Sequence, residues 1–222
     1  MVYPGNHVAL KNINVHIGAG DFVFIVGPSG AGKSTFIKLL FREIVPTTGS
    51  IVLDGQNIPT LTPKEIPFMR RKLGIIFQDF RLLPDRTVYD NIAFAMQVIE
   101  TPYRQIKRRV MNVLDLVGLR RRAYAHPNEL SGGEQQRIAI ARAIVNEPML
   151  VIADEPTGNL DPETSREIME IFQEINNSGT TIIMATHDKE IVDAMSKRVI
   201  AIDHGEIVRD ELNGAYGYES EQ

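Results

Sequence analysis

The sequence predicts an α/β fold that carries an antiparallel β subdomain and an inserted α-helical lobe. Short runs of consecutive β-branched and apolar residues recur along the chain, with helical stretches between several of them. Such runs are typical of parallel strands that helices cover on both faces. Asp54-Gly55 lies between apolar residues and predicts a hairpin turn. Over 85–147 the strand signal disappears and helical spacing replaces it.

Five apolar runs are the expected strands of the parallel sheet. They are Phe22–Val26, Gly74–Phe77, Met149–Ala153, Thr181–Ala185 and Val199–Ile202. Helices are expected after Lys33 and over roughly 163–176. The segment 8–17 is expected to join the Asp54-Gly55 hairpin in one small antiparallel sheet, and 203–207 resembles a last hairpin turn.

The middle of the chain is expected to form the helical lobe. Its apolar residues follow helical spacing on one face, at Ile106, Val110, Val113, Leu114 and Val117. We therefore expect one domain over 1–222. The α/β core with its β subdomain would comprise 1–84 and 148–222, and the lobe 85–147.

Composition narrows the possible functions. The chain has 24 Lys and Arg against 28 Asp and Glu, a net charge of −4. Nucleic-acid binding calls for a clustered basic face, so we expect no nucleic-acid partner. Without cysteine, disulfides and thiolate metal sites are excluded. No apolar stretch approaches membrane-spanning length and the start does not resemble a signal peptide, so any membrane connection is expected through a partner.

"GPSGAGKST" at 27–35 fits the phosphate-binding pattern G-x-x-x-x-G-K-[ST]. It follows an expected strand and opens an expected helix, the context typical of a P-loop NTPase with a RecA-like core. Backbone N–H groups would surround the phosphates, Lys33 would reach the β- and γ-phosphates, and the Ser34 hydroxyl would hold Mg²⁺. The plainer alternative is a glycine-rich turn. The expected nucleotide contacts are Ser29, Gly30, Ala31, Gly32, Lys33, Ser34 and Thr35.

Polar residues follow three other expected strands. Asp154 is placed to hold Mg²⁺, and Glu155 could act as a general base on water. Gln78 can ligate Mg²⁺ and orient water, and His187 can donate to a γ-phosphate. In a parallel sheet all four lie at the carboxyl edge, where the phosphate-binding loop also lies. The alternatives are a helix cap for the aspartate and solvated loop residues for Gln78 and His187.

A second glycine pair occurs in "LSGGEQQR" at 130–137, the signature segment. Ser131, Gly132 and Gly133 lead into a helix that begins near Glu134, which offers a hydroxyl, backbone donors and a positive helix end. A serine-capped helix start is the ordinary reading. It explains Ser131 but gives no reason for two glycines.

In their order, these motifs together with "GNLD" at 158–161 resemble the ATPase domain of ABC transporters over essentially the whole chain. The resemblance implies a head-to-tail homodimer that sandwiches each ATP between one chain's P-loop and the other chain's Ser131–Gly133. It places Asp161 at the dimer interface. Tyr3 fits the aromatic that stacks on adenine, but almost no chain precedes it, so we expect it to be unanchored.

Several stretches narrow the resemblance to the members that act in bacterial cell division, above all "DRTVYDN" at 85–91. That resemblance implies an integral membrane partner, a location at the cytoplasmic face of the cell membrane, and motion passed to peptidoglycan hydrolases without solute pumping. Lipoprotein-releasing and macrolide exporters share "EQQR" and "GNLD" and are the alternative. A DNA-maintenance ATPase is disfavoured, because no coiled coil separates Ser34 from Ser131. Phe80, Leu82 and Leu83 are expected either to receive the membrane partner or to pack the lobe on the core.

Overall fold

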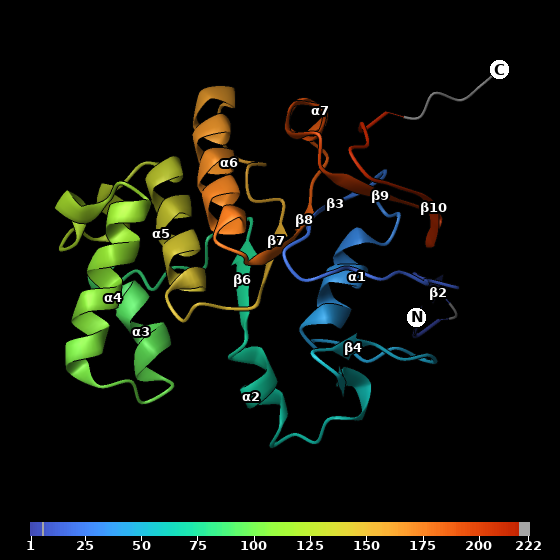
Figure 1. Cartoon of the computed structure of the whole chain (residues 1–222), viewed down its shortest axis with the longest axis horizontal. Coiled ribbons are helices and arrows are strands. Elements are labelled where there is room, and N and C mark those ends of the chain that lie inside the picture. Colours follow the sequence, from blue (N-terminus) through green and yellow to red (C-terminus); the bar gives the residue numbers. More distant parts are fainter. Residues whose placement is uncertain (6, 218–222) are drawn as a thin grey trace.

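The fold is built on a six-stranded sheet in the order β10-β9-β3-β8-β7-β6. The structure is a computed structural model and describes residues 1–5 and 7–217. The strands from β9 to β6 run parallel, and β10 pairs antiparallel with β9 at the edge (Figure 1). Their bounds are β3 (Phe22–Val26), β6 (Leu73–Phe77), β7 (Leu150–Asp154), β8 (Thr181–Ala185), β9 (Arg198–Asp203) and β10 (Glu206–Glu211). The five predicted parallel strands and the last hairpin turn are therefore confirmed.

Helices follow or separate the strands. They are α1 (Lys33–Leu40), α2 (Ile66–Arg70), α3 (Val88–Gln97), α4 (Tyr103–Leu116), α5 (Gly132–Ile144), α6 (Pro162–Asn177) and α7 (Lys189–Met195). Three single 3₁₀ turns are η1 (Ile58–Thr60), η2 (Arg120–Arg122) and η3 (Pro127–Glu129). In the described part of the chain, no helix combines the length and apolar character needed to cross a bilayer.

The sheet is covered on both faces, which explains its continuous apolar strands. Phe22, Phe24 and Val26 of β3 belong to a core shared with α3–α7, whereas the alternate residues Val23 and Ile25 face a second core shared with α1 and α2. All five side chains are buried. Because successive side chains of a strand point to opposite faces, a strand buried on both sides has no polar position.

The antiparallel part consists of two separate hairpins. β4 (Val52–Leu53) pairs with β5 (Gln56–Asn57) around Asp54-Gly55, and β1 (Val2–Tyr3) pairs with β2 (His7–Val8). The expectation that 8–17 joins the Asp54-Gly55 hairpin is wrong. The backbone of this segment finds other partners, because Ala9 N–H donates to the Met1 carbonyl and Lys11 N–H donates to that of Gly205.

The helices α3, α4 and α5 pack on one another at one end of the molecule, and α5 also packs on β6 and α6 (Figure 1). Ile106, Val110 and Leu114 form the buried face of α4, as the spacing predicts. Their core is continuous with the core under the sheet. The chain boundaries of a separate lobe at 85 and 147 remain a prediction.

Candidate functional site: a nucleotide site at the carboxyl edge of the sheet

The phosphate-binding loop connects β3 to α1. Its N-cap, Gly32, has a φ of 113° and gives α1 no side-chain cap. Within the described residues, no acceptor takes the N–H groups of Gly30, Gly32, Lys33, Ser34 and Thr35. A row of free donors at a helix N-terminus is an anion site. The geometry therefore fits the phosphates that the pattern predicts.

Lys33 lies over its own loop. Its Nζ donates to the carbonyl oxygens of Gly27 at 2.7 Å and Pro28 at 3.1 Å. Gly27 and Gly32 both have positive φ, which side chains other than glycine rarely adopt. A Cβ on Gly32 would lie 2.6 Å from the Ala9 carbonyl oxygen. The loop is therefore held close to the N-terminal segment, and only glycine fits there.

Asp154 ends β7 beside the P-loop. Burial raises the pKa of its carboxyl, and the Glu155 charge raises it further, while Lys38, Lys33 and a hydrogen bond from Ser34 act in the opposite direction. A cation beside this carboxylate would relieve the cost of its charge. The carboxylate and hydroxyl oxygens of Asp154 and Ser34 are hard ligands that suit Mg²⁺. These residues therefore fit the expected metal.

Glu155 and His187 are brought into direct contact. Glu155 Oε2 lies 2.8 Å from His187 Nδ1 and accepts the His187 backbone N–H at 3.3 Å. Glu155 has a φ of 51°, in the left-handed region that costs energy for a non-glycine residue. Its backbone N–H donates to the Ala185 carbonyl at the end of β8, which aims the glutamate at the histidine loop.

Gln78 follows β6 at the same edge. Its Nε2 donates to Asn159 Oδ1 at 3.3 Å, and Asn159 Nδ2 donates back to the Gln78 carbonyl at 3.4 Å. Asn159 precedes Asp161, so Gln78 is tied to the segment expected at the dimer interface. The sequence reading did not single out Asn159. Its position inside "GNLD" was the available signal.

Asp161 caps α6 in its own chain. Its carboxylate accepts the backbone N–H groups of Glu163 and Thr164 and the Thr164 hydroxyl at 2.6 Å. These hydrogen bonds hold the pKa of Asp161 below its ordinary value, with the Thr164 side chain the largest cause. Capping alone accounts for the aspartate. Its contact with a second chain remains a prediction.

Ser131 caps α5 through a reciprocal capping box. Its hydroxyl accepts Glu134 N–H, and Glu134 Oε2 accepts Ser131 N–H at 2.9 Å. The serine cap gives no reason for the two glycines, but packing within the chain accounts for Gly133. This residue is buried, and a Cβ there would lie 2.4 Å from Thr164 Cγ2.

Gly132 differs from its neighbour. It is exposed, and the nearest atom to an added Cβ is Leu160 Cδ2 at 3.5 Å, an ordinary contact. Within the described part of the chain, neither the Gly132 nor the Gly133 N–H finds an acceptor. Intramolecular packing therefore does not require glycine at 132, whereas close approach of an external group would.

Tyr3 is anchored, contrary to the expectation of a loose terminus. It lies in β1, and its hydroxyl is 3.3 Å from Thr35 Oγ1 at the start of α1. β1 pairs antiparallel with β2, with Tyr3 opposite His7. Tyr3 thus stands beside the phosphate-binding loop, and stacking on adenine remains a prediction.

Arg142 is a further residue that the sequence reading missed. From the last turn of α5 it donates to the Phe80 carbonyl at 2.8 Å and the Arg81 carbonyl at 2.6 Å. Burial lowers the pKa of its guanidinium. Phe80 and Arg81 both have positive φ. Arg142 therefore fixes a strained loop that begins at Gln78.

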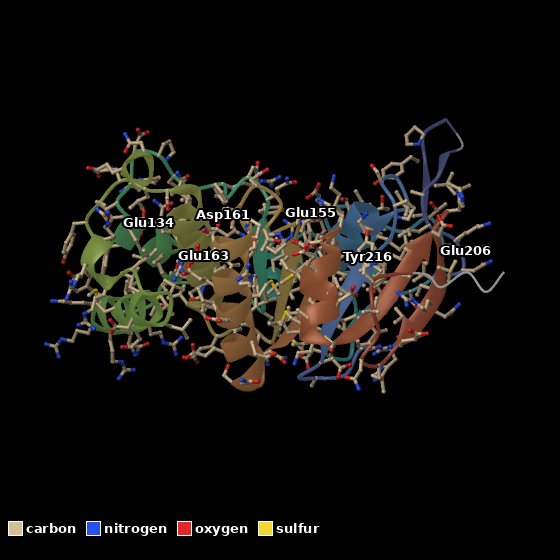
Figure 2. All side chains as sticks on the ribbon, turned by 90° about the horizontal axis from the view of Figure 1, so that it is seen from above. Glu134, Glu155, Asp161, Glu163, Glu206 and Tyr216 are labelled. Carbon is tan, nitrogen blue, oxygen red and sulfur yellow. The ribbon has the colours of Figure 1, made fainter. Side chains whose placement is uncertain are left out.

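The P-loop, Asp154, Glu155, His187 and Gln78 converge on one edge, but the signature segment does not join them. It opens α5, which packs on β6, whereas α1 packs on β7 and β8. In Figure 2, Glu134 lies on the side of the lobe and Glu155 lies nearer the middle of the molecule. The two glycine-led helix starts are thus separate elements of one chain.

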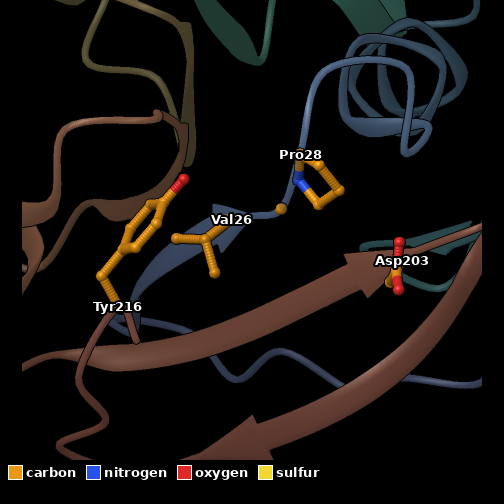
Figure 3. Close-up of a pocket in the computed structure, with 5 residues that line it drawn as sticks. Val26, Pro28, Asp203 and Tyr216 are labelled. Carbon is orange, nitrogen blue, oxygen red and sulfur yellow. The ribbon is translucent and has the colours of Figure 1, made fainter. Parts of the chain in front are cut away.

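Beside the first P-loop residues is a cavity of about 310 Å³, lined by Val26, Gly27, Pro28, Asp203 and Tyr216 (Figure 3). Tyr216 comes from the C-terminal segment, which is fastened where Tyr216 N–H donates to Asp193 and Arg209 donates to the Tyr216 and Gly217 carbonyls. The C-terminal segment therefore packs against the base of the nucleotide loop.

Comparison with known proteins agrees with this geometry. The sequence profile of the ABC transporter family matches residues 10–158. This chain belongs to the ABC transporter family. It is an ATPase of the ABC type and binds ATP.

Its relatives include the cell division ATP-binding protein FtsE of Bacillus subtilis, 60% identical over 97% of this chain and 94% of the relative. FtsE of Escherichia coli is 45% identical over 98% of this chain and 96% of the relative. A dimeric ATP-binding cassette in a post-hydrolysis state with ADP and Pi superposes with a TM-score of 0.83 and 36% identity, covering 95% of this chain and 92% of the other. A subunit of a Clostridium perfringens ABC transporter complex superposes with a TM-score of 0.89 and 34% identity, covering 96% of this chain and 85% of the other.

Proposed function

We propose that this protein is the ATP-hydrolysing subunit of a bacterial cell-division complex. It works as a homodimer at the cytoplasmic face of the membrane, bound to an integral membrane protein like FtsX, and passes ATP-driven motion outward to control peptidoglycan hydrolysis. The cell-division relatives match nearly the full chain, which favours this role over a lipoprotein-releasing or macrolide exporter.

One observation carries the dimer proposal: the chain has two separate glycine-led helix starts whose N–H donors find no acceptor among the described residues. The P-loop start lies beside Asp154 and Glu155, but the signature start at Ser131–Gly133 lies apart from them. A second copy, packed head to tail, would bring its signature segment to the free side of the first copy's phosphates. ATP then supplies contacts that exist only in the closed dimer, which is how a ligand shifts a population.

The chain's own residues have distinct proposed roles in hydrolysis. The N–H groups of the P-loop and Lys33 bind the phosphates, and Lys33 exchanges its carbonyl contacts for phosphate oxygens. Glu155 would accept a proton from the attacking water. His187, which contacts the glutamate through Nδ1, would donate to the γ-phosphate. Ser34, Asp154 and Gln78 would hold Mg²⁺, which neutralises phosphate charge when bound.

Glu155→Gln tests the hydrolytic role. The substitution keeps the shape of the side chain and removes the base, so turnover should fall by roughly 10²–10⁴-fold while ATP still binds. The variant should accumulate as a closed dimer in size-exclusion runs with Mg²⁺-ATP, and wild type should not. Unchanged turnover would exclude Glu155 as the base.

The membrane partner is proposed to contact the loop after Gln78. Phe80 and Leu83 are only half-buried there, whereas Leu82 packs against the core of the lobe. Asn91, fully buried in α3, holds the loop by accepting Leu83 N–H at 2.7 Å and donating to the Leu83 carbonyl at 3.1 Å. An apolar helix of the partner would fit beside these two side chains.

A pull-down separates this contact from ordinary packing. Phe80→Glu and Leu83→Glu should keep the melting temperature and ATP binding but lose the detergent-solubilised membrane subunit. Leu82→Glu is the control for a core position and should lower the melting temperature. If all three variants unfold alike, the loop is core and the partner binds elsewhere. Sequencing the subunit that co-purifies distinguishes a cell-division complex from an exporter.

A further inference from the structure

The outer side of the lobe carries a concentration of positive charge that net composition conceals. Residues 103–122 contain seven Lys and Arg and a single acidic residue, Asp115. Taking these from the chain's 24 basic and 28 acidic residues leaves 17 and 27, so the rest of the protein is strongly acidic. The net charge of the whole chain therefore does not show how its charges are distributed.

Some of these cations are used within the chain. Arg109 pairs with Glu147, Arg120 with Asp115, and Arg122 with Glu134. In contrast, no carboxylate of the described residues lies within 4.0 Å of the cationic groups of four others, which are all exposed: Arg104, Lys107, Arg108 and Arg121. We call these four the basic face. Neither folding nor the nucleotide site accounts for their charge.

Aromatic side chains flank the basic face. Tyr103, at the start of α4, is 73% exposed, and Tyr124, just after η2, is 78% exposed. Tyr124 stacks on Tyr89 with ring centroids 6.5 Å apart. Burial raises the pKa of Tyr89, and the charges of Tyr103 and Tyr124 raise it further. Tyrosines with a wet hydroxyl beside cations are typical of the bilayer interface.

The position of the basic face suits contact with a flat surface. Helix α4 lies at the end of the molecule opposite β9 and β10 (Figure 1), and many of the side chains around it project outward with nitrogen tips (Figure 2). A long polyanion such as a nucleic acid would extend beyond the basic face, and the rest of the chain, which is acidic, would repel it. A planar surface touches one end only, and charges beyond about 8 Å are screened at physiological salt.

We propose that the basic face, with Tyr103 and Tyr124, binds the surface of a bilayer that contains anionic phospholipids. This contact is direct and does not require the membrane subunit, so it goes beyond the proposed function. Arg and Lys attract the headgroup phosphates, and the tyrosine rings enter the headgroup layer. The lobe would thereby be held against the membrane beside its partner.

Vesicle co-sedimentation of the purified full chain tests the proposal. Wild type should bind phosphatidylcholine vesicles that contain phosphatidylglycerol and should not bind phosphatidylcholine alone. Binding should weaken as salt rises. The double variant Arg104→Gln/Arg108→Gln should bind about thirtyfold more weakly. Each basic side chain near such a surface contributes about 1 kcal/mol, and about 1.4 kcal/mol corresponds to a factor of ten in affinity.

The matched control is Lys64→Gln/Arg166→Gln, which removes the same charge from exposed positions outside the basic face. It should bind vesicles like wild type, and both double variants should keep the wild-type melting temperature. If vesicle binding weakened equally in both double variants, the attraction would depend on total charge and not on the basic face, which would overturn the proposal. Absence of binding to either vesicle overturns it too. So does duplex DNA or RNA binding that depends on Arg104 and Arg108 without vesicle binding, since the face would then serve nucleic acid.

Discussion

The two glycine-led helix starts differ in what each completes. Helix α1 begins at an uncapped Gly32, and the N–H groups of Gly30, Gly32, Lys33, Ser34 and Thr35 have no acceptor among the described residues. Helix α5 begins with a full capping box, and within the same part of the chain the Gly132 and Gly133 N–H groups lack acceptors. The first has the geometry of an anion-binding helix start. The second is a capped helix end with two donors that find no acceptor among the described residues.

This difference predicts unequal losses when each start is damaged. Lys33→Ala removes the main phosphate cation and should abolish ATP binding and lower ATPase activity by about a hundredfold or more. Ser131→Arg should abolish turnover to the same extent but leave ATP binding by the monomer intact. Equilibrium binding of a fluorescent ATP analogue checks the first contrast, and steady-state ATPase assays the second.

Mixing the two variants gives the sharper result. In a mixed dimer both lesions fall on one composite site and the other site stays intact, so ATPase activity should reappear. Lack of recovery, with mixed dimers shown to form by differential tags, would mean that each site is contained in one chain. The signature segment would then have no part in binding the partner's ATP.

Substitutions of the glycines by alanine should fall into two groups. Gly32→Ala forces a side chain into positive φ and against the Ala9 carbonyl, and Gly133→Ala forces one against Thr164, so each should lower the unfolding free energy by about 1–3 kcal/mol. Gly132→Ala should change it by less than about 0.5 kcal/mol yet weaken ATP-dependent dimerisation. Urea melts and size exclusion measure the two effects. A large destabilisation at 132 would indicate a structural role.

A gain in stability is expected at Asp154, because burial beside the phosphate-binding loop opposes the charged form of its carboxyl. Its raised pKa means that the folded state binds the proton more tightly than the unfolded state, so stability falls as pH rises through the carboxyl range. Asp154→Asn should therefore stabilise the nucleotide-free protein at pH 7 by roughly 1 kcal/mol, or about 2–4 °C, while abolishing activity. The gain should vanish below about pH 4. A lower melting temperature at pH 7 would contradict this assignment.

The sequence predicts the sheet well because strands buried on both faces admit no polar residue, as Phe22–Val26 illustrates. It fails for 8–17, because the apolar residues there serve the second core while their backbone bonds go to Met1 and Gly205. The sequence also predicts that Asp154, Glu155, Gln78 and His187 share the carboxyl edge of the sheet, because each follows a predicted parallel strand. The contact between Glu155 and His187 was not, since it depends on the left-handed Glu155 backbone.

Other features depend on three-dimensional neighbours that spacing does not encode. Gly133 is explained by Thr164, a residue of another helix. Arg142 is an ordinary polar position of α5 in the sequence, and its role depends on the Phe80 and Arg81 carbonyls, which lie about sixty residues away along the chain. The basic face was visible in the sequence as "RRR" and "KRR", but a whole-chain charge count averages it away.

Helix α5 has a further consequence for how two ATP molecules are used. In the proposed dimer, its first residues touch the nucleotide of the partner, and Arg142, about 15 Å along the helix, grips the loop that starts at the Gln78 of its own site. Helix α5 therefore joins the two sites as one rigid element, so a shift at one end would move the other. ATP bound at one site would raise the affinity for ATP at the other, so turnover should rise sigmoidally with ATP concentration. Arg142→Lys would remove the two-pronged contact with this loop, and the two ATP sites should then hydrolyse ATP independently, without the sigmoidal dependence.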